Sequence, residues 1–481
     1  MAAFSSDGQR CIEQQVGPIN VSPTPLNELR SAYELDRCDS WIQTNHYSKV
    51  CLQFPDELLC DAPDIVLILQ NSSGAHCYIL GDTSYGSCCV DEVSAEHVQC
   101  DGIIHFGHAC LSPTRRLPVL YIFPKNPFDV ERLCSAVNAT FKDRKSKLLF
   151  IYDVTYAHKI DEVYDTLSCL YPNLVTAYPN VSSCHTKEGK EQQQVCLGSR
   201  FCIPEGTSLD DYNVLFIGKD GRTFTNYLLE FGADCKIFRY DPDEPVSVIE
   251  AADGKISKFL MKRLHLVERV KDAKTLGILI GTLGVDGYLD AVDQIKNLAK
   301  KAGKKTYIFA VGRPNIPKLA NFPEIDVFVL VACPENSLLD WKDFYQPVVS
   351  LYEVELACNT LRQWSTKYVS DFRQLLLGGK DHVQLPEISM ENFSDVSLIT
   401  GKVRNVDITN IASAESDSSN RSITDRGDLT VCLSTGSEFL VNRTWQGLEQ
   451  NLGQNPVELA TLGRSGIASS YHSEPVQRDA D

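Results

Sequence analysis

The stretch GDTSYGSCCVDEVSAEHVQCDGIIHFGHACLS (Gly81–Ser112) contains four of the 18 cysteines of this 481-residue chain. It follows an apolar strand predicted over Cys77–Leu80 and leads into a predicted helix with Ser87 as its N-cap. Cys88 and Cys89 are therefore expected at or just before the helix N-terminus. The positive end of a helix dipole favours a thiolate over a thiol. The motif thus predicts two cysteines in the ionised form that a soft metal needs.

A second strand is predicted near the end of the same stretch. It spans Gly102–Phe106 and is followed by Gly107-His108-Ala109-Cys110, so a third thiol comes soon after the C-terminal end of a strand. In open parallel sheets, ligands gather at that edge. Two histidines flank this strand end, His105 and His108, and we expect local hydrogen bonds to satisfy them. The sequence therefore favours Cys110 over these histidines as a candidate ligand.

Strands and helices alternate along most of the chain, which predicts an α/β fold with small, mostly parallel sheets flanked by helices. The alternation forms three similar units. We divide the chain into a flexible N-terminal arm (1–30), three α/β domains (31–144, 145–260 and 261–380), a polar flexible segment (381–437) and a C-terminal tail (438–481).

The first and third units match element for element. In each unit an aspartate, Asp101 or Asp326, directly precedes the last of the matching strands. Beyond that strand each unit continues to an Ala-Cys pair, which ends at Cys110 or Cys333. If the units are copies of one fold, the two thiols occupy equivalent positions at the sheet edge. The second unit has no such cysteine directly after its corresponding strand, Val214–Gly218.

Composition and charge argue against several classes of protein. The chain has 46 Lys and Arg against 63 Asp and Glu, a net charge of -17, which argues against nucleic-acid binding and favours a basic partner. It has no apolar run near the ~20 residues of a membrane span, and its beginning lacks a signal-peptide pattern. We therefore expect a cytoplasmic protein with no nucleic-acid or membrane partner. In a reducing compartment its cysteines serve metal binding, redox chemistry or packing rather than disulfides.

Most of the cysteines need no functional explanation, because a free cysteine packs like a small apolar residue. This interpretation covers those in apolar strands and helices, namely Cys51, Cys60, Cys77, Cys169 and Cys235. Structural zinc sites usually carry C-x-x-C pairs, which this chain lacks. Three thiols from distant loops fit better a [4Fe–4S] cluster with one iron open to another ligand, although four cysteines are the usual number.

A glycine loop offers a different kind of site. Residues Gly281–Gly287 leave a strand and open a helix, where backbone N–H groups can bind a phosphate. This alternative predicts an independent α/β enzyme with a nucleotide-type cofactor. The spacing is not G-x-G-x-x-G and no lysine follows as in a P-loop, so we favour glycines that serve tight turns.

Six motifs resemble those of the diphthamide biosynthesis proteins. Four of them, within a resemblance over about residues 30 to 375, are GDTSYGSCCVD (81–91), GHACL (107–111), ACPENS (332–337) and YEVELA (352–357). The closing motifs NRTWQGL (442–448) and GRSGIA (463–468) resemble the second subunit of the eukaryotic two-subunit enzyme in particular.

The resemblance implies three similar domains around a central [4Fe–4S] cluster, in a heterodimer with a related first subunit. It implies the first step of diphthamide synthesis, in which a 3-amino-3-carboxypropyl group passes from S-adenosylmethionine to a histidine of elongation factor 2 by a radical route. In that route an electron from the cluster cleaves the bond between sulfur and Cγ of S-adenosylmethionine. An electron donor protein is implied as a further partner.

The resemblance also assigns metal ligands residue by residue. The first-domain cysteine of the family falls on the Cys88-Cys89 pair, where we favour Cys89 with Cys88 as its substitute, and the third-domain cysteine falls on Cys333. The second-domain L-G-C motif of the catalytic subunit reads Leu197-Gly198-Ser199 here, so Cys110 is the candidate replacement. These assignments imply a supporting subunit whose cluster delivers electrons to the catalytic cluster of the partner. The alternative is a purely structural partner whose thiols hold zinc or no metal.

Overall fold

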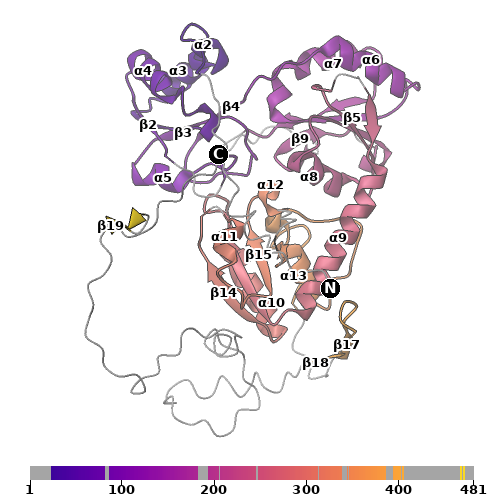
Figure 1. Ribbon diagram of the computed structural model, residues 1–481. Helices are drawn as coiled ribbons and strands as arrows, with labels where there is room; N and C mark the ends of the chain where they lie inside the picture. Colours follow the sequence, from indigo (N-terminus) through magenta and orange to yellow (C-terminus); the bar gives the residue numbers. More distant parts are fainter. Residues whose placement is uncertain are drawn as a thin grey trace, which may run out of the picture. The chain divides into compact units, whose positions relative to one another are not determined.

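Short apolar runs separated by helices form three larger sheets in this computed structural model (Figure 1). The structure describes residues 23–81, 86–181, 193–204, 206–244, 248–312, 314–338, 344, 346–385, 394–401, 403–405, 466–467 and 470–471. The three larger sheets belong to one unit, residues 1–425. A second unit, residues 426–481, contains the described strands β19 (Gly466–Ile467) and β20 (Ser470–Tyr471).

The first sheet is parallel and has the strand order β2-β1-β3-β4. Alternate residues face opposite sides, so Leu52 and Ile104 pack against α2, α3 and α4, whereas Cys51 and Ile103 pack on the side of α5. The bounds are β1 Lys49–Gln53, β2 His76–Ile79, β3 Gly102–Phe106, β4 Val119–Ile122, α2 Leu29–Ala32, α3 Leu35–Thr44, α4 Ala62–Ser73 and α5 Glu92–His97.

The second sheet has the order β12-β11-β10-β5-β6, with only β12 antiparallel to its neighbour. Phe150 faces α6 and α7, and Ile151 faces α8 on the opposite side. A small antiparallel sheet, β7-β9-β8, packs on the α8 side. The bounds are β5 Leu148–Tyr152, β6 Leu174–Thr176, β7 Tyr178–Pro179, β8 Gln193–Cys196, β9 Ser199–Cys202, β10 Asn213–Ile217, β11 Lys236–Tyr240, β12 Ile249–Ala251, α6 Val130–Thr140, α7 Ile160–Ser168 and α8 Arg222–Phe231.

The third sheet is parallel with the order β14-β13-β15-β16. Ile278 packs toward α9, α10 and α13, and Leu279 packs on the opposite side with α11. The bounds are β13 Thr275–Ile280, β14 Lys305–Phe309, β15 Val327–Val331, β16 Val348–Val349, α9 Asp253–Asp272, α10 Tyr288–Lys301, α11 Ile316–Leu319, α12 Pro334–Ser337 and α13 Leu351–Cys358. A hairpin of β17 (Ser394–Val396) and β18 (Val403–Asn405) follows.

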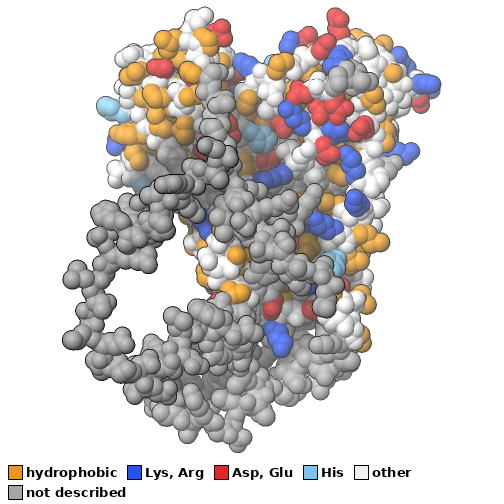
Figure 2. Space-filling model, in the orientation of Figure 1, with side chains coloured by type: hydrophobic (Ala, Val, Ile, Leu, Met, Phe, Trp, Pro, Cys, Tyr) orange, Lys and Arg blue, Asp and Glu red, His pale blue; other side chains and the backbone are white. Residues whose placement is uncertain are grey.

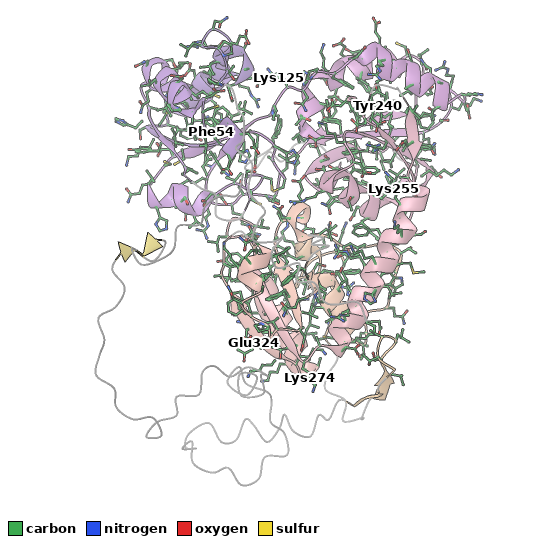
Figure 3. The ribbon with its side chains drawn as sticks, in the orientation of Figure 1. Phe54, Lys125, Tyr240, Lys255, Lys274 and Glu324 are labelled. Atoms are coloured by element: carbon green, nitrogen blue, oxygen red, sulfur yellow. The ribbon has the colours of Figure 1, made fainter. Side chains whose placement is uncertain are left out.

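The predicted match between the first and third units is confirmed in detail. Numbered along the chain, the parallel strands of both sheets run in the order 2-1-3-4. The carboxylate of Asp101 accepts hydrogen bonds from the backbone N–H groups of Ser48 and Lys49, at 2.7 and 2.9 Å. Asp326 likewise accepts hydrogen bonds from the backbone N–H groups of Lys274 and Thr275, at 2.8 and 2.9 Å. Figure 3 places Lys274 and Glu324, which precede β13 and β15, at the same end of the third sheet.

The second sheet repeats this order, since β6-β5-β10-β11 is also 2-1-3-4. The predicted α/β class with small, mostly parallel sheets is therefore confirmed. Residues 1–425 form a single unit by their contacts, so the boundaries between three domains stay a prediction. Of the predicted N-terminal arm, residues 23–30 are described, and Thr24 donates a hydrogen bond to Asp61. The predicted polar segment and tail lie largely outside the described residues.

Three local predictions were wrong. The helix expected from Ser87 begins at Glu92, with Asp91 as its N-cap, because the Asp91 carboxylate accepts the N–H of Ser94. Two cysteines expected to be buried, Cys60 and Cys169, are exposed, because Cys60 lies in the turn before α4 and Cys169 caps the solvent end of α7.

Lys and Arg side chains lie among Asp and Glu side chains on the face that Figure 2 shows. None of the helices in the described residues combines the length and the apolarity needed to cross a bilayer.

Candidate metal centre

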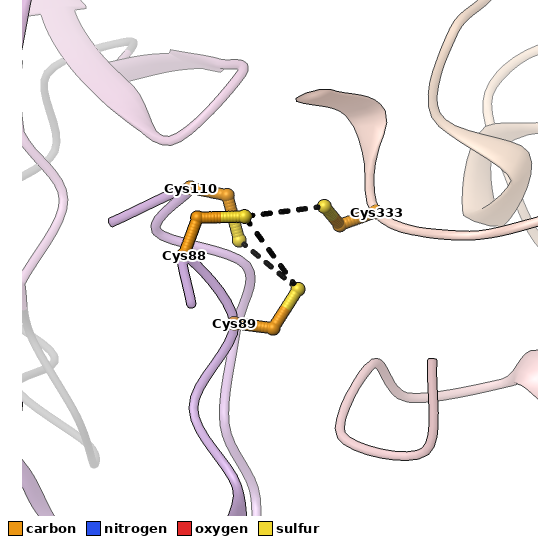
Figure 4. A group of neighbouring side chains, drawn as sticks. All are labelled: Cys88, Cys89, Cys110 and Cys333. Carbon is orange, nitrogen blue, oxygen red and sulfur yellow. Dashed lines mark hydrogen bonds between the residues drawn. The ribbon is translucent and has the colours of Figure 1, made fainter. Parts of the chain in front are cut away.

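Four cysteine sulfurs converge at the carboxyl ends of strands from the first and third sheets (Figure 4). Cys88 and Cys89 follow β2, Cys110 follows β3, and Cys333 follows β15. The Sγ of Cys88 lies 4.0 Å from that of Cys89 and 3.8 Å from that of Cys333, and the sulfurs of Cys89 and Cys110 are 3.7 Å apart. All four sulfurs lie within 4.8 Å of one another. We call these four residues the thiol group.

The turn that carries Cys88 and Cys89 is held by the ends of β1 and β3. Gln53 donates its amide to the carbonyl oxygen of Cys89 at 2.7 Å and accepts the N–H of Asp91 at 3.0 Å. The backbone N–H of Cys110 donates to the carbonyl oxygen of Cys88 at 3.0 Å. The buried Gln53 at the end of β1 thus holds the backbone of the turn that carries both thiols.

The glycine loop Gly281–Gly287 packs against the same turn. A Cβ atom at Gly284 would lie 2.3 Å from the carbonyl oxygen of Val90, so no side chain fits there. Thr282 accepts the N–H of Val285 within the loop at 3.3 Å. This arrangement supports the interpretation of these glycines as turn and packing residues.

The loop after β15 presents Cys333. This residue is 1% exposed and is the N-cap residue of the short helix α12. Its carbonyl oxygen accepts the N–H groups of Asn336 and Ser337, at 3.0 and 2.9 Å. Pro334 at the first helical position suits this turn, because its ring fixes a helical φ.

The four thiols share their ionisation. Hydrogen bonds from Cys333, Cys88 and Cys89 lower the pKa of Cys110 well below the usual range of a thiol. The contact with Cys110 in turn raises the pKa values of the other three. The sequence placed Cys88 and Cys89 at a helix N-terminus, and this was wrong because α5 begins only at Glu92. Like charges this close ionise together only beside a cation, so the group is suited to bind one.

His108 connects all three sheets beside the thiol group. It follows β3, and its Nε2 lies 2.9 Å from the carboxylate of Glu335 in α12, while Nδ1 lies 3.6 Å from Asp153 at the end of β5. Burial alone would lower the pKa of His108, but these two carboxylates raise it to about 11. The imidazole is therefore protonated and bridges two acids. The expectation that hydrogen bonds satisfy His105 holds for one ring nitrogen only. Its Nε2 lies 3.0 Å from the carbonyl oxygen of Ser87, while the buried Nδ1 has no hydrogen-bond partner among the described residues.

A cleft of about 580 Å³ opens beside Cys88. Its walls come from all three sheets and are rich in charged side chains. They consist of Asp56, Glu57, Gly86, Ser87, Cys88, His108, Asp153, Arg222, Thr223, Glu335 and Asn336. The thiol group is thus accessible from one side through Cys88, which is only partly buried, while Cys89 and Cys333 are buried.

The structure brings together all three predicted ligands, Cys89, Cys110 and Cys333, and adds Cys88, which the sequence offered only as a substitute for Cys89. Sequence reasoning missed the roles of Gln53 and Asn336. Asn336 lies in the ACPENS motif, so its proximity to Cys333 was a usable signal. Gln53 gave none, since a single polar residue at a strand end is common.

Comparison with known proteins identifies the family of this chain. A family model described as "Putative diphthamide synthesis protein" matches residues 54–369. The chain belongs to the diphthamide synthesis protein family. Its relatives include 2-(3-amino-3-carboxypropyl)histidine synthase subunit 2 of Danio rerio, 43% identical over 98% of this chain and 97% of the relative. The human protein of the same name is 34% identical, over 98% of this chain and 99% of the relative. The Schizosaccharomyces pombe protein of that name is 36% identical, over 99% of this chain and 97% of the relative.

Solved structures show the same fold. The crystal structure of Dph2 from Pyrococcus horikoshii with a 4Fe-4S cluster aligns with a TM-score of 0.53 at 21% identity, covering 73% of this chain and 96% of that one. A second crystal structure of the same protein aligns with a TM-score of 0.50, over 69% and 91% of the two chains.

In this diphthamide synthesis protein the small sheet β7-β9-β8, which packs on the α8 side of the second sheet, approaches the site with a glycine turn. The turn between β8 and β9 is Leu197-Gly198, and a Cβ at Gly198 would lie 3.0 Å from the carbonyl oxygen of Cys110. The next residue, Ser199, is buried, and its hydroxyl lies 2.8 Å from that of Tyr227. The position that would supply a second-sheet ligand therefore makes a hydrogen bond inside the second sheet's own core.

Proposed function

We propose that this chain is the iron–sulfur subunit of a heterodimer that catalyses the first step of diphthamide biosynthesis. In this step a 3-amino-3-carboxypropyl group passes from S-adenosylmethionine to a histidine of elongation factor 2. The chain supports or reduces the catalytic cluster of a related first subunit, and receives electrons from a donor protein in the cytoplasm. The observation that carries the proposal is the convergence of four thiols from distant loops in a chain whose relatives are named subunit 2 of this synthase.

The thiol group fits a [4Fe–4S] cluster in its chemistry. Cysteine thiolates are the usual ligands of such clusters, and four is the usual number. We propose Cys89, Cys110 and Cys333 as ligands, with Cys88 completing the set. Cys88 borders the cleft of about 580 Å³, so the thiol group is open on that side. When bound, the cluster supplies one-electron transfer.

The residues around the thiols favour a supporting role. Gln53 and the backbone at Cys110 hold the Cys88-Cys89 turn, and His108 ties the three sheets together through two carboxylates. Ser199 stands where the catalytic-subunit pattern has a cysteine, and its hydroxyl is bonded to Tyr227. These contacts hold the loops that carry the thiols, and four cysteines leave no iron of a cubane cluster without a cysteine ligand.

One observation favours a second candidate, a structural zinc subunit. Zinc bound by four thiolates at ~2.3 Å in a tetrahedron separates neighbouring sulfurs by ~3.8 Å. The three measured separations of 3.7 to 4.0 Å match that spacing. In this alternative the metal holds the first and third sheets together and transfers no electron.

Anaerobic purification of the full chain with its first subunit separates the two candidates. We expect a brown complex in which this chain contributes about four irons and matching sulfide, because that is the content of one cubane cluster. A colourless complex with one zinc on this chain would overturn the electron-transfer role. Transfer activity from this chain without the first subunit would overturn the supporting role.

A further inference from the structure

One side chain outside the thiol group contacts two of its sulfurs. The amide nitrogen Nδ2 of Asn336 lies 3.2 Å from the Sγ of Cys88 and 3.4 Å from the Sγ of Cys333. Cys88 belongs to the first sheet and Cys333 to the third, and their sulfurs are 3.8 Å apart. A single amide group therefore spans the junction between the two sheets at the thiol group.

The direction of this amide is determined by Arg222. The guanidinium Nη1 lies 2.9 Å from Oδ1 of Asn336, and a guanidinium can only donate hydrogen bonds. The amide oxygen must therefore face Arg222, which leaves the NH₂ group facing the sulfurs. Arg222 is the first residue of α8, which packs on the second sheet. A residue from the sheet that supplies no thiol therefore orients the amide that donates to thiols of the first and third sheets.

Gly86 leaves the space that the amide occupies. A Cβ atom at this position would lie 2.8 Å from Nδ2 of Asn336 and 3.9 Å from the Sγ of Cys88. The backbone of Asn336 is held as well, since its N–H donates to the carbonyl oxygen of Cys333 at 3.0 Å. Two hydrogen bonds and the space at Gly86 thus keep one N–H donor group on the two sulfurs.

We propose that Asn336 is a positioning residue that raises the reduction potential of the cluster held by Cys88 and Cys333. The inference rests on the proposed function. One-electron reduction adds a negative charge that spreads onto the ligand sulfurs, and N–H groups aimed at those sulfurs stabilise the reduced form more than the oxidised form. Removing the donor therefore makes the cluster harder to reduce.

The test is an anaerobic redox titration of the full complex with dithionite, followed by electron paramagnetic resonance, with iron measured on each sample. In Asn336→Leu, which keeps the approximate volume but cannot donate, we expect wild-type iron and a reduction equilibrium at least tenfold less favourable, a shift of ~59 mV to lower potential for one electron. In Asn336→Asp we expect a larger shift in the same direction, because a carboxylate also repels the thiolates.

Two further variants make the result specific. Gly86→Ala leaves Asn336 in place but pushes its amide away from the sulfurs, so we expect a smaller shift in the same direction. Asn173→Asp is the matched control, because Asn173 also donates its amide, to Lys145, but lies before β6 at the opposite end of a sheet. We expect the wild-type potential in this control.

Each outcome decides the inference. An unchanged potential at full iron content in Asn336→Leu overturns it and leaves the proposed function standing. If Asn336→Leu loses its iron, Gly86→Ala decides, and a wild-type potential there also overturns the inference. A wild-type complex without iron overturns the proposed function and this inference together.

Discussion

The first and third sheets differ from the second in what they deliver to one site. All three share the strand order 2-1-3-4, and all three reach the site with the loops after their strands. The first and third supply thiols, whereas the second supplies Asp153, Arg222 and Thr223, which bind His108, Asn336 and Glu335. The comparison teaches that the shared topology places the carboxyl-terminal edge of each sheet at the site. The residue types at that edge then decide whether it supplies metal ligands or side chains that position those ligands.

The largest effect should come from removing the thiol of the third sheet. Cys333→Ser should reduce the iron on this chain to a small fraction of the wild-type content, because no other residue of the thiol group comes from that sheet. Iron and sulfide analysis after anaerobic purification measures the loss. Cys169→Ser is the matched control, since that thiol is exposed at the end of α7. Wild-type iron in Cys333→Ser would contradict the assignment.

A second prediction concerns the link between the second sheet and the others. His108→Ala leaves Asp153 and Glu335 without their shared cation, and unpairing partly buried charges should lower the free energy of unfolding by ~2 kcal/mol. Urea denaturation of the complex measures this change. His76→Ala, at an exposed position of β2, should have little effect. Equal stability of both variants would show that the three sheets hold together without this bridge.

The equivalence of the first and third sheets can be tested with a matched pair. Asp101 and Asp326 each accept two backbone N–H groups at the amino ends of their sheets. Replacing either residue by alanine should lower the free energy of unfolding by ~1 kcal/mol, because two backbone donors lose a charged acceptor. Thermal unfolding of the two variants should give similar decreases. A decrease in only one of them would break the structural equivalence.

The smallest effect is expected where the second sheet departs from the family pattern. Ser199→Cys should leave the iron content unchanged, because this side chain is bonded to Tyr227 in the core of the second sheet and four thiols already converge at the site. Iron analysis and the resonance spectrum of the reduced cluster test this. A new spectrum or additional iron would mean that the second sheet can still contribute a ligand.

Sequence patterns predicted the sheets better than the details of the site. The strand Gly102–Phe106 has the predicted bounds, because a short run of apolar residues between turn residues usually forms a buried strand in an α/β chain. The start of α5 was misplaced, because Ser87 and Asp91 are both good N-caps and only a tertiary contact decides between them. Gln53 binds the N–H of Asp91 and the carbonyl of Cys89, which holds this segment in a turn.

The sequence by itself determined the α/β class, the match between the first and third units, and Cys89, Cys110 and Cys333 as candidate ligands. The class and the match follow from local periodicity, and the ligand candidates follow from motifs that resemble those of the family. Only the tertiary structure decided that Cys88 joins them, that His108 bridges two acids, and that Arg222 turns the amide of Asn336 toward the sulfurs. Such contacts join residues up to 248 positions apart, and their geometry depends on how the sheets pack, which no local pattern records.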